Sequence, residues 1–134
     1  MVKAIYVNLQ VSDLARSKAF FEALGFAFNP QFTNEQAAAL VISDTIYAML
    51  HTRESILRFT KKELVDARSS TEVLLALQVE SREEVDALVT KALEHGGRQA
   101  REAADHGFMY ERSFEDPDGH VWEAFWMDPA QMAG

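Results

Sequence analysis

The sequence has no cysteine among its 134 residues. That absence excludes a disulfide framework, a thiolate metal site and a cysteine nucleophile. Long hydrophobic runs are missing as well, because no apolar stretch approaches the roughly 20 residues that a membrane-spanning helix needs. The N-terminus lacks the apolar core and the cleavage site of a signal peptide. We therefore expect a cytoplasmic protein that does not insert into membranes, with one domain over residues 1–134.

Basic residues are scarce relative to acidic ones. Thirteen Lys and Arg stand against 21 Asp and Glu, which gives a formal net charge of -8 and a pI of about 4.9. Such a surface repels nucleic acid and anionic membranes, so neither is expected as a partner. A phosphate-binding glycine loop and a serine in a nucleophile elbow are also missing. Apolar residues nevertheless make up 48% of the chain, which is enough for a core.

The first part of the chain has the pattern of one strand, one helix and three further strands. A strand is expected over residues 3–11, and Ser12-Asp13 supplies a helix cap and a first-turn acid. Apolar residues at helical spacing predict a helix over residues 14–24, which Gly25 ends. Three short strands follow, over residues 26–32, 36–43 and 45–52.

The second part repeats this order. A strand over residues 72–80 leads to Ser81 and Glu84, a capping box that starts a helix running to Gly96. Further strands are expected near residues 98–102, 108–115 and 120–127, with a loop over residues 103–107. The two units begin roughly 70 residues apart, which indicates an internal repeat. The sequence predicts an α+β domain of two βαβββ repeats, with a first half over about 1–52 and a second half over about 71–127. The connector between them, about 53–70, is expected to be either a helix or a flap.

Two motifs carry a family resemblance. The first is NLQVSDL at residues 8–14, followed by SKAFF at 17–21 and ALGF at 23–26; the second is FEDPDGHVWE at 114–123. Together they resemble the vicinal-oxygen-chelate superfamily of glyoxalase I, bleomycin-resistance proteins and extradiol dioxygenases. The resemblance implies a curved mixed sheet around a U-shaped cavity, a small-molecule ligand and a homodimer. Trp122 and Trp126, on the far face of the last strand, would suit the dimer interface or the core.

Enzymes of that superfamily hold a divalent metal, and the resemblance assigns the ligand positions to Tyr6, Met49, Leu74 and Glu123. A divalent metal with an open position generally needs three or four His, carboxylate or amide donors. Only Glu123 is such a donor, so we expect no catalytic metal ion as a cofactor. A shifted set of Glu123 with His51 and Gln78 is the alternative, because strand alternation puts these residues on the faces of the expected positions.

The same alternation defines a candidate binding site. The ligand-binding residues that we expect are Tyr6, Asn8, Tyr47, Met49, His51, Leu74, Gln78, Tyr110, Arg112 and Phe125. This mainly apolar set with a few polar groups is typical of small-ligand sites. Glu123 is the candidate catalytic residue, acting on protons or as a residual ligand. Its alternative is a structural carboxylate that pairs with Arg112 or bonds to Tyr6.

Three functions are compatible with these residues. The first is binding of an unidentified small organic molecule without a catalytic metal, either to sequester it or to transform it. The second is a glyoxalase-like lyase or an extradiol-dioxygenase-like oxidoreductase that uses the shifted metal ligands. The third is a non-catalytic interaction module. The donor count favours the first function and leaves open whether the chain is an enzyme.

Overall fold

The structure, a computed structural model, describes residues 1–132. The chain divides into two compact units, Met1–Leu64 and Val65–Gly134. The cavity that the resemblance implies stays a prediction. No helix within residues 1–132 combines the length and the apolar character that crossing a membrane requires.

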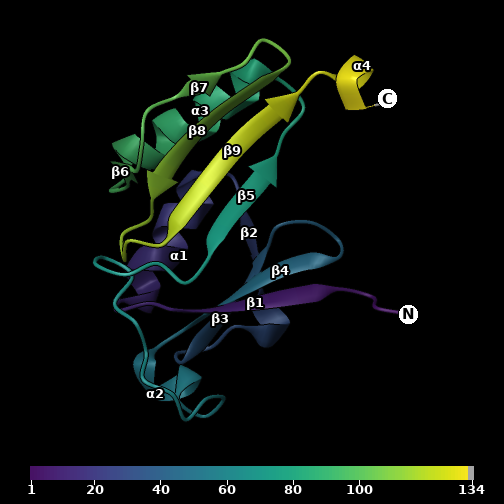
Figure 1. The fold of residues 1–134 in the computed structure, drawn as a ribbon. Helices are drawn as coiled ribbons and strands as arrows, with labels where there is room; N and C mark the ends of the chain where they lie inside the picture. Colours follow the sequence, from purple (N-terminus) through teal and green to yellow (C-terminus); the bar gives the residue numbers. More distant parts are fainter. Residues whose placement is uncertain (133–134) are drawn as a thin grey trace. The chain divides into compact units, whose positions relative to one another are not determined.

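The first unit is a four-stranded sheet in the order β1-β4-β3-β2, drawn in purple and blue in Figure 1. Strand β1 runs parallel to β4, and the other neighbours are antiparallel. Its elements are β1 (Ile5–Gln10), α1 (Leu14–Ala23), β2 (Ala27–Asn29), the 3-10 helix η1 (Pro30–Phe32), β3 (Ala37–Val41), β4 (Ile46–His51) and α2 (Arg53–Ile56).

Helix α1 lies where the sequence predicts, but Asp13 is its cap and not an acid of its first turn. The Asp13 carboxylate accepts a hydrogen bond from the Arg16 amide at 3.0 Å, so Asp13 is the cap. Gly25 follows the helix at φ 100°, a conformation that favours glycine. Phe20 and Phe21 are at most 2% exposed and form the core of the unit with Leu50 and other apolar residues of the sheet.

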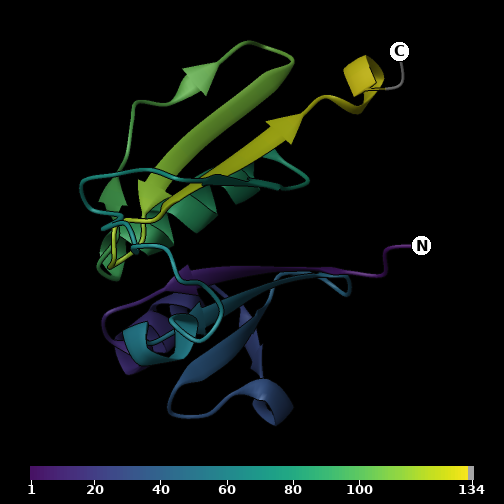
Figure 2. The same ribbon diagram turned by 60° about the horizontal axis from the view of Figure 1, so that its bottom comes forward.

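The second unit repeats the plan in the order β5-β9-β8-β6, with β7 paired to β8 and β5 parallel to β9. Figure 2 shows α3 lying along one face of β8 and β9. The elements are β5 (Leu74–Gln78), α3 (Arg82–Glu94), β6 (Arg98–Gln99), β7 (Ala104–Asp105), β8 (Met109–Glu115), β9 (Val121–Met127) and α4 (Pro129–Met132). The predicted α+β fold of two βαβββ repeats is therefore confirmed.

Three local expectations need correction. The Ser81 hydroxyl caps α3 by accepting from the Glu84 amide, but the Glu84 carboxylate accepts from the Glu80 amide and not from that of Ser81. The connector is helical only over Arg53–Ile56. The loop expected over residues 103–107 contains the short strand β7, because Ala104 and Asp105 pair with β8.

A buried carboxylate organises the turn between β8 and β9. Asp116 is 4% exposed and accepts hydrogen bonds from the amides of Asp118 and His120 and from the Trp122 indole, each at 3.0 Å. Gly119 completes the turn at φ 91°, and a Cβ there would lie 2.8 Å from the Arg68 Cα. Only glycine fits, because the conformation and the neighbouring backbone both exclude a side chain.

Candidate functional site

The first and last strands of each repeat pair in matching register. In the first sheet Tyr6 lies opposite Tyr47 and Asn8 opposite Met49. In the second sheet Leu74 lies opposite Val121 and Ala76 opposite Glu123. Counting along these ladders, Tyr6 corresponds to Leu74 and Met49 to Glu123. The four positions that the resemblance assigns to metal ligands are thus equivalent pairs in the two sheets.

Alternation places five of the expected residues on one side of the first sheet, which we call the Tyr6 face: Tyr6, Asn8, Tyr47, Met49 and His51. The rings of Tyr6 and Tyr47 are stacked, with centroids 4.6 Å apart and planes 12° from parallel. Tyr6 is 51% exposed, and the Tyr47 hydroxyl donates to the Asp44 carbonyl at 2.8 Å. The pair forms an accessible, anchored aromatic surface.

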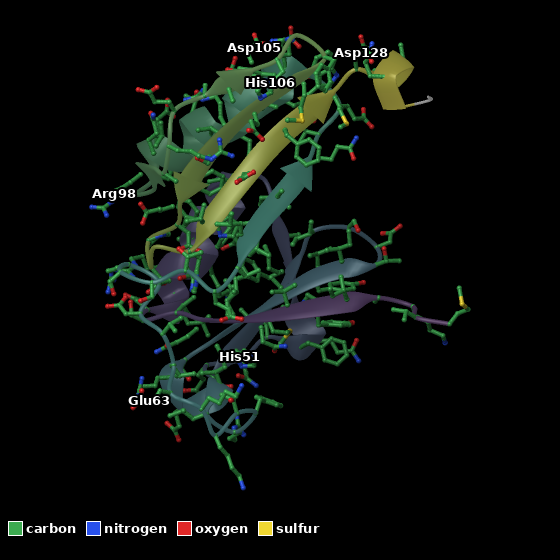
Figure 3. The ribbon with its side chains drawn as sticks, in the orientation of Figure 1. His51, Glu63, Arg98, Asp105, His106 and Asp128 are labelled. Carbon is green, nitrogen blue, oxygen red and sulfur yellow. The ribbon has the colours of Figure 1, made fainter. Side chains whose placement is uncertain are left out.

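His51 closes the other end of the Tyr6 face and is only 3% exposed. Its Nε2 lies 2.7 Å from the Asn8 Oδ1, and its Nδ1 lies 2.8 Å from the Ser55 Oγ. Because an amide oxygen only accepts, Nε2 carries the proton and Nδ1 accepts from the serine hydroxyl. Figure 3 shows His51 beside the segment that contains α2.

The surroundings of His51 favour the neutral imidazole. Burial lowers the pKa of His51, and the nearby Arg58 guanidinium lowers that pKa further. Arg58 Nη2 also lies 3.4 Å from the Ser55 Oγ and donates to it. Sequence reasoning missed Ser55 and Arg58, since they follow the strand in a connector with no periodic pattern. The one signal in the sequence was the Ser55 hydroxyl, a hydrogen-bond donor four residues after His51 at the end of a strand.

On the second sheet, the Glu123 face includes Leu74, Ala76, Gln78, Glu123 and Phe125, together with Glu111, Ser113 and Glu115 of β8. The residue opposite Glu123 on β8 is Ser113. Arg101, which the sequence did not single out, places Nη2 2.9 Å from the Glu123 Oε1 and Nη1 3.3 Å from the Glu111 Oε1. Glu123 is therefore paired with an arginine, though not with the one expected.

The expectation that Tyr110 and Arg112 accompany Glu123 is wrong. The Tyr110 hydroxyl donates to Asp86 Oδ1 at 2.6 Å, and Arg112 Nη1 lies 3.0 Å from the same oxygen. Asp86 belongs to α3, so both side chains lie on the helix-covered face. The Tyr110 hydrogen bond and the Arg112 charge lower the pKa of Asp86. The cause is register: Ser113 pairs with Glu123, which turns residues 110 and 112 to the opposite side.

The side of β9 that carries Trp122 and Trp126 also makes contacts within the chain. Trp122 is fully buried, and its indole nitrogen donates to Asp116. Trp126 contacts the Arg82 guanidinium, which lies 5.0 Å from the ring centroid. Trp122 is thus a core residue and gives no support to the expected dimer interface.

The side chains do not fit the metal ion that the resemblance implies. Neutral tyrosine and thioether sulfur are poor ligands for hard divalent ions, and Leu74 has no donor. In the shifted set, both ring nitrogens of His51 are already hydrogen-bonded and Glu123 is paired with Arg101. Within residues 1–132, no three His, Asp or Glu side chains are grouped as metal ligands.

A small cavity of about 190 Å³ lies beside the β8–β9 turn. It is lined by Arg68, Gly96, Arg98, Glu115, Asp116, Pro117 and Gly119. None of the residues expected to bind a ligand lines it, and its two arginines are balanced by two carboxylates.

Comparisons with known proteins cover nearly the whole chain. The family model described as the glyoxalase/bleomycin resistance protein/dioxygenase superfamily matches residues 3–124. A hypothetical protein from S. aureus is 30% identical, with a TM-score of 0.78 over 94% of this chain and 95% of the other. No functionally curated protein shows significant similarity.

More distant structures share the fold. A glyoxalase/bleomycin resistance protein/dioxygenase family enzyme from Burkholderia phytofirmans is 20% identical, with a TM-score of 0.75 over 91% of this chain and 96% of the other. The fosfomycin resistance protein FosX from Mesorhizobium loti is 13% identical, with a TM-score of 0.70 over all of both chains. At these identities the likeness concerns the fold alone.

Proposed function

Since this chain belongs to the glyoxalase/bleomycin resistance protein/dioxygenase superfamily, we propose that it binds a small organic molecule through its own side chains, without a catalytic metal ion. The observation that carries the proposal is the chemistry at the four equivalent strand positions. Three of them hold Tyr6, Met49 and Leu74, and the fourth, Glu123, is paired with Arg101 at 2.9 Å. A tight divalent site needs more donors than this set supplies.

The Tyr6 face supports direct ligand binding. It combines an accessible stacked tyrosine pair with the polar groups of Asn8 and His51. Small-ligand sites generally have this composition, with aromatic area for contact and a few fixed polar groups for orientation. Buried His51 is engaged at both nitrogens, so its role is to hold neighbouring groups in place.

The direct test is titration calorimetry of tag-free protein with Ni²⁺, Zn²⁺, Mn²⁺ and Fe²⁺. We expect no stoichiometric binding to the wild type or to Glu123→Ala. The matched control is Glu115→Ala, which removes another carboxylate from the same side of the second sheet. Stoichiometric binding that Glu123→Ala abolishes and Glu115→Ala retains would contradict the proposal and favour a metal-dependent lyase or dioxygenase.

A second experiment screens small organic molecules for those that raise the melting temperature of the protein in the presence of EDTA. A ligand that binds only the folded chain, at a free concentration 100 times its Kd, adds about 2.7 kcal/mol to the free energy of unfolding. The melting temperature therefore rises with ligand concentration. We expect stabilising compounds to act equally with and without EDTA. Stabilisation that appears only after metal is added would argue against metal-free binding.

Homodimer formation, which the family resemblance implies, is a separate proposal. Light scattering at micromolar concentration tests it, and we expect twice the mass of the 15.1 kDa chain. A monomer at that concentration would count against the dimer.

A further inference from the structure

A chain of hydrogen bonds fixes the orientation of the Asn8 amide. Arg58 donates to the Ser55 hydroxyl, Ser55 donates to His51 Nδ1, and His51 Nε2 donates to the Asn8 Oδ1. Every donor points the same way, because the arginine cation cannot accept and the Asn8 oxygen cannot donate. Hydrogen bonds aligned in this way polarise one another.

The exposed end of this chain is the Asn8 Nδ2 group. Since the Asn8 oxygen is turned toward His51, the amide nitrogen presents its two hydrogens on the other side. One hydrogen makes a long bond of 3.4 Å to the Tyr6 carbonyl oxygen. No acceptor within residues 1–132 is paired with the second, and Asn8 is exposed.

The oriented donor lies next to the stacked tyrosines. Asn8 follows Tyr6 by two residues on the same strand and the same face, a separation of about 7 Å along the strand. A flat ring can lie against an aromatic pair and gain contact area at little entropic cost, since tyrosine has few rotatable bonds. An oxygen attached to such a ring is then within reach of Asn8.

We infer that the Tyr6 face binds a flat conjugated molecule that lies against Tyr6 and Tyr47 and places a carbonyl oxygen on Asn8 Nδ2. His51 and Ser55 are positioning residues, because they act through the orientation of the amide. The inference rests on the proposed metal-free binding and adds a class of ligand to it.

Three probes separate the two contributions. 1-Indanone has a flat ring and a conjugated carbonyl, indane has the ring alone, and cyclohexanone has the carbonyl alone. Binding is measured by titrating each probe into ¹⁵N-labelled protein with EDTA present and following the backbone and the Asn8 side-chain amide signals. We expect 1-indanone to bind about fivefold more tightly than indane, the usual effect of one hydrogen bond, and cyclohexanone to bind weakest.

Variants assign that preference to Asn8. Asn8→Ala should abolish the fivefold preference for 1-indanone and leave the affinity for indane unchanged. Gln10→Ala, a change on the same strand and face, is the matched control and should retain the preference. Each variant is first shown to be folded by its amide spectrum.

Substitutions of Ser55 test whether this residue acts through the orientation of the Asn8 amide, because a purely structural role would not change the preference for 1-indanone over indane. Ser55→Ala removes the donor to His51 Nδ1, so the imidazole proton can move to Nδ1 and the Asn8 amide can turn over. The preference for 1-indanone should fall while the affinity for indane stays the same, and Ser55→Thr, which keeps the hydroxyl, should restore it.

The outcomes distinguish this inference from the proposed function. Equal affinity for indane and 1-indanone, or a preference that survives Asn8→Ala, overturns the carbonyl assignment but leaves metal-free binding intact. Failure of all three probes overturns the flat-ligand assignment, whereas the EDTA melting screen judges metal-free binding. Binding of 1-indanone only after metal is added overturns both.

Discussion

Residues 1–64 carry seven basic and six acidic side chains, whereas residues 65–134 carry six basic and fifteen acidic ones. The formal charges are therefore +1 for the first unit and -9 for the second, with the boundary that the contacts define. The net negative charge of the chain therefore comes entirely from its second unit. A repeat of backbone structure thus does not require a repeat of surface chemistry.

The Tyr6 face of the first sheet and the Glu123 face of the second also differ in their charged groups. Counting along the paired strands, Asn8 corresponds to Ala76 and His51 to Phe125. The Tyr6 face holds neutral polar and aromatic groups, and the Glu123 face holds a carboxylate bound to Arg101. The repeat preserves the register and the buried side of each sheet, because these decide folding, and leaves the other side free to diverge.

Each unit also contains a buried titratable group, His51 in the first and Asp116 in the second, and these two groups respond to pH in opposite ways. Burial lowers the pKa of His51 and raises the pKa of Asp116. The histidine is held neutral between two neutral partners, whereas the carboxylate accepts three hydrogen bonds.

The largest effect is expected from Asp116→Ala. The substitution leaves the buried Trp122 indole N–H without an acceptor and removes two turn hydrogen bonds. We expect the free energy of unfolding to fall by about 3 kcal/mol, since each buried unsatisfied group costs about 1–3 kcal/mol. Urea unfolding measures the change, with Asp128→Ala, a half-buried carboxylate that accepts one turn hydrogen bond, as control. A loss below about 1 kcal/mol would contradict the central role given to Asp116.

The next effect is the pH dependence that His51 confers. Because its pKa is lower in the folded chain than the ordinary 6.5, the unfolded chain binds the proton first as the pH falls. The stabilisation is complete above pH 6.5 and declines below it, by at most about 1.4 kcal/mol per pH unit for one proton. Urea unfolding between pH 7 and pH 5 should show this slope.

His51→Gln should flatten the slope over that range, whereas His106→Gln, at an exposed histidine in the second unit, should retain it. Asp116 acts in the opposite sense, because its raised pKa adds stability as the pH falls toward 3.8. An unchanged slope in His51→Gln would show that the histidine is not desolvated as the structure indicates.

The sequence predicted the repeat well because caps, glycines and periodicity are local signals. Asp13, Ser81 and Gly25 lie where the helices begin and end. The side on which β8 presents its residues was missed, since a one-residue change in register between β8 and β9 turns every side chain over. The turn over residues 116–119 fixes that register through the hydrogen bonds that Asp116 accepts, and these bonds are defined only in the folded chain.

The candidate site was predicted in part for the same reason. Alternation along the parallel pair β1 and β4 was sufficient to group Tyr6, Asn8 and His51. Ser55 and Arg101 were not foreseen, because Ser55 lies in the short helix α2 and Arg101 lies between β6 and β7, both outside the strand pairings. The pairing of Arg101 with Glu123 joins residues far apart in the sequence and depends on the folded path of the chain.

A smaller effect is expected from Glu123→Met, which gives the second repeat the residue that the first carries at Met49. The change removes the ion pair with Arg101, whose side chain is 43% exposed. We expect a loss of less than about 1 kcal/mol, reduced further in 0.5 M NaCl, as for other partly exposed pairs. Thermal unfolding at two salt concentrations measures it. A loss above about 2 kcal/mol would mean that Glu123 has a structural role that this ion pair does not explain.

The smallest effect on stability is expected from Tyr6→Leu, which gives the first repeat the residue that the second carries at Leu74. An aromatic pair contributes about 0.5–1.5 kcal/mol beyond its buried area. Because Tyr6 is 51% exposed, we expect the lower end of that range in urea unfolding. The affinity for a flat probe such as 1-indanone should nevertheless fall several-fold, since half of the aromatic surface is lost.

Tyr6→Phe is the matched control for that substitution, because it keeps the ring that stacks on Tyr47 at 4.6 Å. Its stability and its affinity for 1-indanone should equal those of the wild type. If Tyr6→Leu binds the probe as well as Tyr6→Phe does, the aromatic pair is not the binding surface, and the difference between the two repeats at this position has no part in ligand recognition. If only the leucine variant loses affinity, the ring at position 6 serves binding at a position where the family's enzymes are expected to hold a metal ligand.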